Sequence, residues 1–311
     1  MTFQAILFGL TFFSFIFWAP IWAEEFGADL ADVMWANVGM MVAQGLMSPF
    51  VGHAMDRRSI KWLVTAGAII AAVGFVAVAR ATQIWHIVFI YSTLIPLGIL
   101  LAGPLAAQTL AAKWFSARRG LAIGISTTGT SIGGFILPVL VGFLFSAYGW
   151  RTTHLLLAAL IVMVVIPVVW LIVANQPADK GVAPEADLIP HGQGGSAPVF
   201  PAWTTMGILK ERNFWVVICA FVPLLTAQGA VQANLAAFAI DLGVAREMTP
   251  GLISLMAVTM IGGKLFFGRQ ADKWDHRYLF LIAVALITTV VCLMLSAPSY
   301  TTLLVIAGIL G

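Results

Sequence analysis

Two related segments organise this 311-residue chain: GHAMDRRSIK at residues 52–61 and GRQADKWDHR at residues 268–277. Each begins with glycine, has aspartate four positions later and ends with a basic residue nine positions after the glycine. The matches share one offset of 216 residues, which carries positions 52, 56 and 61 onto 268, 272 and 277. Each segment lies between two long apolar runs. A motif repeated at equivalent places predicts a duplicated unit of apolar helices.

The composition around these segments is that of a membrane protein. Hydrophobic residues make up 61% of the chain and charged residues 9%, whereas soluble domains have about 25% charged residues. The net charge of +3 is too small for a nucleic-acid-binding surface. The two cysteines, Cys219 and Cys292, cannot build a disulfide framework or a cysteine-based metal site. A water-soluble globule and a nucleic-acid-binding protein are therefore excluded.

Apolar runs bounded by charge predict the transmembrane helices. A helix needs about 20 apolar residues to cross the hydrocarbon core, and only helices suit runs of this length. Nine runs qualify, namely residues 3–22, 33–51, 62–79, 86–110, 121–145, 152–174, 214–240, 250–267 and 278–297. A tenth run opens at Thr301. Tryptophans near the predicted ends are expected at the headgroup level, namely Trp22, Trp62, Trp85, Trp150, Trp215 and Trp274.

Charge and composition between the runs predict orientation and domains. The loops after the second, fourth, sixth and eighth runs hold most lysines and arginines, which places them and the N-terminus in the cytoplasm. Residues 175–212 are polar and rich in proline and glycine, so they predict a flexible cytoplasmic linker. The linker separates an N-terminal six-helix bundle, residues 1–174, from a partial C-terminal bundle, residues 213–311.

The first segment has the form Gly-x-x-x-Asp-Arg-x-x-x-Lys and resembles the loop motif between the second and third spans of the major facilitator superfamily. A second stretch, KWFSARRGLAIGI at residues 113–125, is followed by Gly129, Gly133, Gly134, Pro138 and Gly149-Trp150-Arg151. This stretch resembles the branch of monocarboxylate porters and oxalate/formate antiporters. The drug/proton antiporter signature instead has proline after the glycine that matches Gly129, where this chain has Thr130.

The resemblance covers essentially the whole chain and implies its fold class. We expect an all-α membrane protein of the major facilitator fold, with two six-helix bundles around a central cavity and alternating access between them. About nine to ten transmembrane helices are present here, so the second bundle is incomplete. If the offset of 216 residues also relates the ends of the two bundles, a complete second bundle would end near residue 390. About two and a half spans of that bundle would then be missing from this chain. We therefore expect the chain to be a fragment.

Lys264 is the main candidate for substrate binding. It is the one lysine or arginine well inside a predicted span, and a charge there costs about 2.5–3.5 kcal/mol unless it faces a wet cavity. The alternative is a lysine that reaches the nearby interface along its aliphatic chain. The resemblance favours binding, because carboxylate transporters of this branch carry a basic residue four positions before the loop glycine of the eighth span. Lysine here replaces the usual arginine.

Further substrate contacts are expected from polar side chains in the first, fourth and seventh spans, which line the cavity in the superfamily. The candidates are Ser14, Tyr91, Thr226, Gln228 and Gln232. Such groups would be costly if they faced lipid. Hydrogen bonding between helices explains each of them as well as a binding role does. No role is predicted for His154, which stands at the start of the sixth run.

The repeated loop motif is expected to act as a gate. By resemblance, Asp56 would pair with Arg57 or with a neighbouring helix N-terminus, and Gly52 would let two helices approach closely. Lys61 would add positive charge to the cytoplasmic loop, which helps to set the orientation of the chain, and would contact lipid headgroups. In the second copy, Gly268, Asp272 and Arg277 would repeat the role. The alternative is that these residues only set the orientation of the chain.

The predicted function is secondary active transport of a small organic anion, a mono- or dicarboxylate. No acidic residue lies in a predicted span, so exchange for a counter-anion fits as well as proton symport. The expected partners are the anionic substrate, a proton or counter-anion, and the lipid of the cell's inner membrane. No nucleic acid, cofactor or metal is expected, and we predict a monomer.

Three alternatives remain. One, within transport, is an exporter of a hydrophobic neutral or cationic compound. Another is a sensor that uses the same fold without transport. The third, an enzyme, would need a buried acid, base or metal constellation, and the spans show none. We therefore predict that the protein is not an enzyme.

Overall fold

The computed structural model describes residues 1–115, 118–175, 205–245, 248–296 and 299–311, and every element in these ranges is a helix. The chain divides into two compact units, Met1–Ala186 and Asp187–Gly311. Their boundary falls inside the predicted linker, of which residues 176–204 lie outside the described part. Each unit is described by itself below. Because the described residues form helices throughout, the all-α fold class is confirmed.

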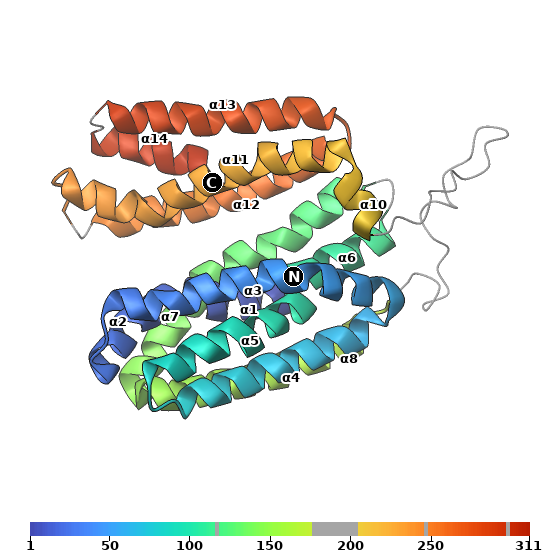
Figure 1. Ribbon diagram of the computed structural model, residues 1–311. Helices are drawn as coiled ribbons and strands as arrows, with labels where there is room; N and C mark the ends of the chain where they lie inside the picture. The colour runs from blue at the N-terminus through green and yellow to red at the C-terminus, as the bar shows by residue number, and fades with distance from the viewer. Residues whose placement is uncertain (116–117, 176–204, 246–247, 297–298) are drawn as a thin grey trace. The chain divides into compact units, whose positions relative to one another are not determined.

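Unit 1 is built around α5, which packs between α3 and α4 (Figure 1). In chain order its elements are α1 (Thr2–Phe8), the π-helical turn η1 (Gly9–Phe13), α2 (Phe15–Phe26), α3 (Leu30–Arg57), α4 (Ile60–Ala79), α5 (Ile84–Ala102), α6 (Pro104–Trp114), α7 (Arg119–Leu160), the π-helical turn η2 (Ile161–Val165) and α8 (Ile166–Ile172). Helix α7 also packs on α1, η1 and α4. These contacts enclose one continuous hydrophobic core.

Unit 2 has fewer helices and a smaller core. Its elements are α10 (Thr205–Lys210), α11 (Arg212–Asp241), α12 (Thr249–Ala271), α13 (His276–Leu295) and α14 (Tyr300–Leu310). Helix α14 packs against α11, α12 and α13. Leu303, Ile306 and Ala307 of α14 are fully buried, together with Leu235 and Leu252 of the longer helices. The short α14 therefore holds the described part of unit 2 together.

The helices account for the predicted spans. Six helical stretches are long and apolar enough to cross a membrane, and the bent pair Thr2–Phe13 and Phe17–Phe26 would be a seventh. One of the six, Arg119–Ile172, covers both the fifth and the sixth predicted runs. The second run lies inside α3, which has 28 residues and a less apolar sequence. At about 1.5 Å per residue, α3 is still long enough to span.

Gly149 explains why one stretch contains two spans. Its backbone has φ 72° and ψ 169°, which is not helical, so the chain turns between the helical segments on either side of it. Only glycine adopts such a conformation without strain. The predicted break between residues 145 and 152 therefore coincides with this turn.

At the start of α13, Asp275 caps the helix by accepting a hydrogen bond from the backbone N–H of Arg277 at 2.9 Å.

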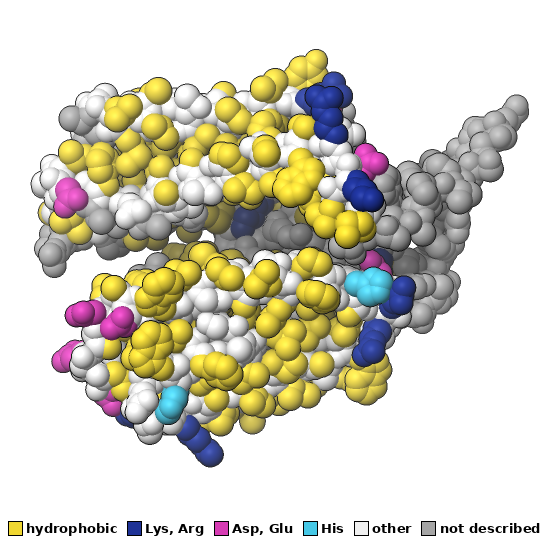
Figure 2. Space-filling view, viewed as in Figure 1, with side chains coloured by type: hydrophobic (Ala, Val, Ile, Leu, Met, Phe, Trp, Pro, Cys, Tyr) yellow, Lys and Arg dark blue, Asp and Glu magenta, His cyan; other side chains and the backbone are white. Residues whose placement is uncertain are grey.

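The surface of each unit agrees with a membrane environment (Figure 2). Hydrophobic side chains cover the flanks of the helices, and charged side chains gather near the helix ends. Large apolar residues such as Phe50, Phe89 and Phe143 are exposed on unit 1. In water such a surface would favour aggregation, whereas in lipid it is the stable arrangement.

The tryptophan prediction is wrong for two of the six residues and stays a prediction for the other four. Trp62, Trp85, Trp215 and Trp274 are exposed, as expected for side chains at the headgroup level. Trp22 and Trp150 are instead buried, and their rings meet at a centroid distance of 6.5 Å. They belong to the core of unit 1 because each packs edge-on against other aromatic rings near the end of its helix.

Candidate functional site

Lys264 lies in α12, within the candidate span Gly251–Ala271. Its side chain is half-buried. The next loop begins after Ala271, so about two helical turns separate the lysine from the end of its helix. A lysine at this depth needs a polar environment, because an ammonium group in hydrocarbon is costly.

Lys264 lines a cavity of about 680 Å³ in unit 2. Three of its lining residues carry polar side chains: Lys264 and Thr259 from α12, and Gln228 from α11. The remaining walls are apolar and come from α11, α12, α13 and α14, including Ile287 of α13 and Ile309 of α14. A mostly apolar cavity with a few polar groups is the usual form of a small-molecule site.

The polar groups of this cavity suit an anion. The ammonium group of Lys264 and the amide N–H groups of Gln228 are donors, and the ammonium carries the positive charge. Thr259 donates its hydroxyl hydrogen to the carbonyl oxygens of Leu255 at 2.9 Å and Met256 at 3.1 Å. A carboxylate group accepts hydrogen bonds only, so it matches the lysine and the glutamine. The apolar walls suit a short carbon chain.

Two of the predicted substrate residues, Lys264 and Gln228, therefore meet in one cavity. Gln232 is half-buried one turn further along α11, and Thr226 is exposed and donates to the carbonyl of Val222 at 2.8 Å. Neither lines the cavity. Thr259 does line it but was missed by the sequence reasoning. A lone hydroxyl group in an apolar span was its only signal, and most such hydroxyl groups bond to their own helix.

Ser14 and Tyr91 occupy the interior of unit 1. The Ser14 hydroxyl donates to the carbonyl oxygen of Gly9 at 3.0 Å, across the π-helical turn. The Tyr91 ring packs edge-on against Phe15 and Trp22 at centroid distances of 5.3 and 5.6 Å. Both side chains are buried. Packing accounts for them in this structure, and their role in substrate binding stays a prediction.

The first loop motif does not show the contacts expected of it. Among the described residues Asp56 has no ion-pair partner, so the predicted pair with Arg57 is not seen; both side chains are exposed. Among the described residues of unit 1, no atom beyond the backbone of its own helix lies within 4 Å of a Cβ placed on Gly52, so the expected close approach of a second helix is not seen within this unit. The end of α3 is held instead by Lys113, whose ammonium group donates to the carbonyl oxygen of Met55 at 2.8 Å. A cation at a helix C-terminus is stabilising.

Lys61 has a structural role that the sequence did not suggest. Its ammonium group donates to the carbonyl oxygen of Trp170 at 3.0 Å and lies 4.6 Å from the centre of that indole ring. Its backbone N–H donates to Oδ1 of Asn175 at 3.0 Å. The basic end of the motif thus joins α4 to the chain after α8 within unit 1. Headgroup contact through Lys61 stays a prediction.

The second copy of the motif surrounds the turn between α12 and α13. Gly268 lies in the last turns of α12, Asp272 follows the helix, and Arg277 stands in the first turn of α13. Asp272 and Arg277 are exposed. Their role as a gate stays a prediction.

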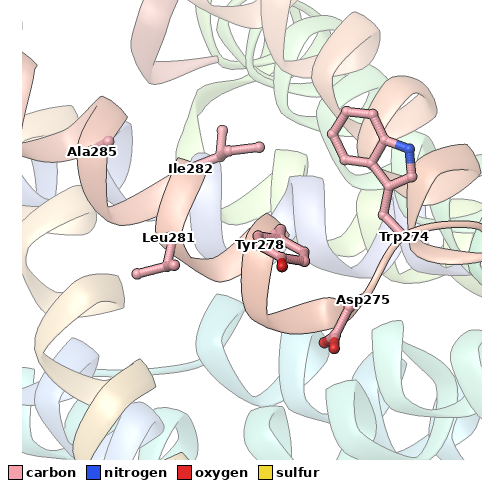
Figure 3. A pocket seen from close by; sticks show the side chains of 6 residues that line it. All are labelled: Trp274, Asp275, Tyr278, Leu281, Ile282 and Ala285. Atoms are coloured by element: carbon pink, nitrogen blue, oxygen red, sulfur yellow. The ribbon is translucent and has the colours of Figure 1, made fainter.

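A second hollow lies beside this turn, on the outer face of α13 (Figure 3). It is lined by Trp274, Asp275, Tyr278, Leu281, Ile282 and Ala285. Asp275 carries the one charge among these residues, and its carboxylate already caps α13. Because this hollow has no basic group, it does not suit an anion. The Lys264 cavity is therefore the better candidate for the anion site.

The described chain is thus a helical, multi-span membrane protein with a basic cavity in its second unit. It matches the Major Facilitator Superfamily over residues 1–311, and it belongs to that superfamily. Human Monocarboxylate transporter 11 is 26% identical over 255 residues, which are 82% of this chain and 51% of that protein. An MFS-type transporter of Gibberella moniliformis is 25% identical over 272 residues, 87% of this chain and 61% of that protein.

The name of the human relative agrees with the predicted branch, and the chain spans 51% to 61% of the length of these two relatives. Among solved structures, a bacterial homologue of the human lysosomal transporter Spinster, in an inward-facing and unoccupied conformation, is similar with a TM-score of 0.50. The identity is 16%, and the match covers 99% of this chain and 71% of that one. At this identity the similarity shows the fold alone, which is the major facilitator fold.

The two glutamines of α11 allow a matched test of the cavity. We expect Gln228→Leu to weaken carboxylate binding about 5- to 10-fold, because one hydrogen bond to a charged group is worth about 1.5 kcal/mol or slightly less here. Gln232→Leu makes the same chemical change outside the cavity and is expected to bind normally. Both variants would be titrated with a labelled carboxylate in detergent. Equal losses in the two variants would contradict the assignment of Gln228 to the site.

Proposed function

We propose that the protein is a secondary active transporter of a small organic anion, with a mono- or dicarboxylate as the substrate class. The observation that carries the proposal is the cavity in unit 2, where Lys264 and Gln228 line a largely apolar space. Membership of the major facilitator superfamily and the monocarboxylate transporters among the relatives support it.

The mechanism we propose begins with the substrate carboxylate displacing water from around Lys264. The ammonium group pairs with the carboxylate, and the Gln228 amide donates a second hydrogen bond. Once paired, the two charges cost less to enclose than either does alone. Enclosure of the neutral pair lets the two units alternate between states open to opposite sides. We propose further that the N-terminus is cytoplasmic, that the protein acts as a monomer in the inner membrane, and that the loop motifs close the cytoplasmic side.

The runner-up function is export of a hydrophobic neutral or cationic compound. The apolar walls of the cavity would accept such a compound, but the ammonium group of Lys264 would repel a cation and gain nothing from a neutral molecule. A sensor without transport would use the same cavity and would bind the anion without moving it.

Uptake measurements on the protein in proteoliposomes separate these functions. The panel contains labelled mono- and dicarboxylates, the amide of one monocarboxylate and a lipophilic cation. We expect saturable uptake of at least one carboxylate and none of the amide or the cation. Saturable movement of the cation would favour the exporter. Carboxylate binding without uptake, measured on the same preparation, would favour the sensor.

A further inference from the structure

An apolar groove of about 460 Å³ lies on the surface of unit 1, between α4 and the part of α7 that follows Gly149, together with η2. Its floor is made of alanines: Ala72 and Ala158 are buried and Ala159 is half-buried. Its rims are larger side chains, of which Val73 and Met163 have exposed fractions of 53% and 73%. We call the space lined by these residues the α4–α7 groove.

The two helices that form this groove carry the same pattern in opposite directions. On α4 the lining positions 69, 73 and 76 are followed four residues later by Arg80. On the other side, Arg151 is followed by the lining positions 155, 158 and 162, with the same steps of four, three and four residues. Residues at these spacings share one face of a helix. Each arginine therefore lies on the groove face of its helix, one turn beyond the lining residues.

Both arginines lie at the same end of the groove, because the two helices are antiparallel. Lys61, at the start of α4, donates a hydrogen bond to the carbonyl oxygen of Trp170, near the end of α8. The rings of Trp62 and Trp170 also meet there, with centroids 4.8 Å apart. The end of α4 with Arg80 thus lies beside the start of the α7 segment with Arg151. We call this end the mouth of the groove.

The length of the groove matches one leaflet of a bilayer. Eleven residues separate Ile69 from Arg80, which is about 16 Å of helix at about 1.5 Å per residue. Half of a hydrocarbon core of about 30 Å is about 15 Å. With the arginines at the headgroup level, the groove extends to the middle of the membrane. It therefore has the length and the apolar lining that one acyl chain of a single leaflet requires.

The mouth carries a positive charge that no protein group offsets in the described structure. The Arg80 side chain is exposed and has no ion-pair partner among the described residues. Arg151 pairs with Glu25 at 2.6 Å and stacks on Trp150 at 4.2 Å. A guanidinium group has five N–H donors, so Arg151 retains donors for a further acceptor. Arginine donors in such numbers suit a phosphate group.

The position of the two arginines is unusual within unit 1. The other lysines and arginines of residues 1–175 lie at the opposite helix ends, namely Arg57, Arg58, Lys61, Lys113, Arg118 and Arg119. Membrane proteins concentrate basic residues on one side in this way. The acidic residues at the Arg80 end belong to α2, α3 and the turn between them. The two exceptions to the charge pattern thus both flank the one groove, which points to an anionic ligand there.

We propose that the α4–α7 groove binds one anionic phospholipid, with an acyl chain along the alanine floor and the phosphate against Arg80 and Arg151. Hydrocarbon of some lipid fills any apolar groove that faces the membrane interior, so the acyl chain alone gives no selectivity. The selectivity comes from the mouth, because basic groups beside a membrane helix favour anionic headgroups. The inference goes beyond the proposed transport function and does not rest on it.

Photolabelling of the unaltered protein tests the site. The probe is phosphatidylglycerol with a diazirine midway along one acyl chain, added to nanodiscs of phosphatidylcholine, and mass spectrometry of peptides locates the label. We expect label at Val73 and Met163, reduced at least about fivefold by excess unlabelled phosphatidylglycerol and unchanged by the same excess of phosphatidylcholine. Equal reduction by both lipids would overturn the proposal. So would label spread evenly over exposed apolar residues such as Phe50, Phe89 and Phe143.

Two pairs of variants test the mouth and the floor separately. Arg80→Gln should lower the labelling about fivefold, and Arg58→Gln, at an exposed position near the start of α4, should leave it unchanged. Ala159→Phe fills the floor and should abolish the labelling, whereas Ala31→Phe, at an exposed position of α3, should keep it. Equal labelling of Arg80→Gln and Arg58→Gln would overturn headgroup recognition. Should Ala159→Phe not fold, the lipid competition on the unaltered protein decides whether the groove is the site.

Discussion

Carboxylate uptake is expected to fall at least about 30-fold when Lys264 is replaced by glutamine. Glutamine keeps the length and polarity of the side chain but removes the charge that pairs with the substrate. Removing one partner of a buried charge pair costs about 2–5 kcal/mol, and about 1.4 kcal/mol corresponds to tenfold. Uptake of a labelled carboxylate into proteoliposomes measures the loss.

Two further variants make this result interpretable. Lys264→Arg restores the charge and should recover a large part of the uptake, although the guanidinium is wider than the ammonium. Lys210→Gln makes the same change at an exposed position at the end of α10 and should transport normally. If Lys264→Gln transports like Lys210→Gln, the lysine only extends toward the membrane surface and the anion site lies elsewhere.

The second large effect is expected at Gly133, where α7 meets the first helix. A Cβ on Gly133 would overlap the carbonyl oxygen of Ala5 and would lie 2.9 Å from the Ala5 Cα. These are backbone atoms and cannot turn away. Gly133→Leu should therefore separate α1 from α7 and destabilise unit 1 by about 3 kcal/mol or more, the upper range for overpacked cores. Thermal unfolding and gel filtration in detergent would show a lower midpoint or aggregation.

Gly142 is the matched control, since it is on the same helix and a Cβ there meets nothing within 4 Å. Gly142→Leu should leave the unfolding midpoint unchanged or raise it slightly, because leucine has the higher helix propensity. Equal destabilisation by the two substitutions would show that α7 tolerates no side chain at either place. The close approach of α1 to α7 at Gly133 would then not explain the effect of the substitution.

Much of the fold follows from the length and spacing of the apolar runs. Each predicted span has a helix in the structure, because only helices satisfy the backbone in lipid. The internal break of α7 could also be predicted, since Gly149 lies between the fifth and sixth apolar runs. The tryptophans show the limit of this reasoning. Trp62 and Trp22 both stand at helix ends, and whether such a ring faces lipid or other aromatic rings depends on how the helices pack.

The site was predicted less completely than the fold. A charge inside an apolar run is rare and costly, so Lys264 could be found from the sequence alone. Gln228 and Gln232 could not be ranked, because they are one helical turn apart and only the cavity distinguishes them. His154 received no role, and two of the helices that bring aromatic rings to it, α2 and α4, are distant from it in the sequence. Residue spacing cannot reveal such a cluster.

The central claim is that Lys264 recognises the negative charge of the substrate, and a comparison of two ligands on two proteins tests it most directly. The dissociation constants of a short monocarboxylate and of its neutral amide are measured by equilibrium binding to the unaltered protein and to Lys264→Gln. The account predicts that the unaltered protein prefers the carboxylate at least about 30-fold and that the variant binds both ligands alike. An equal preference for the carboxylate in both proteins would contradict it.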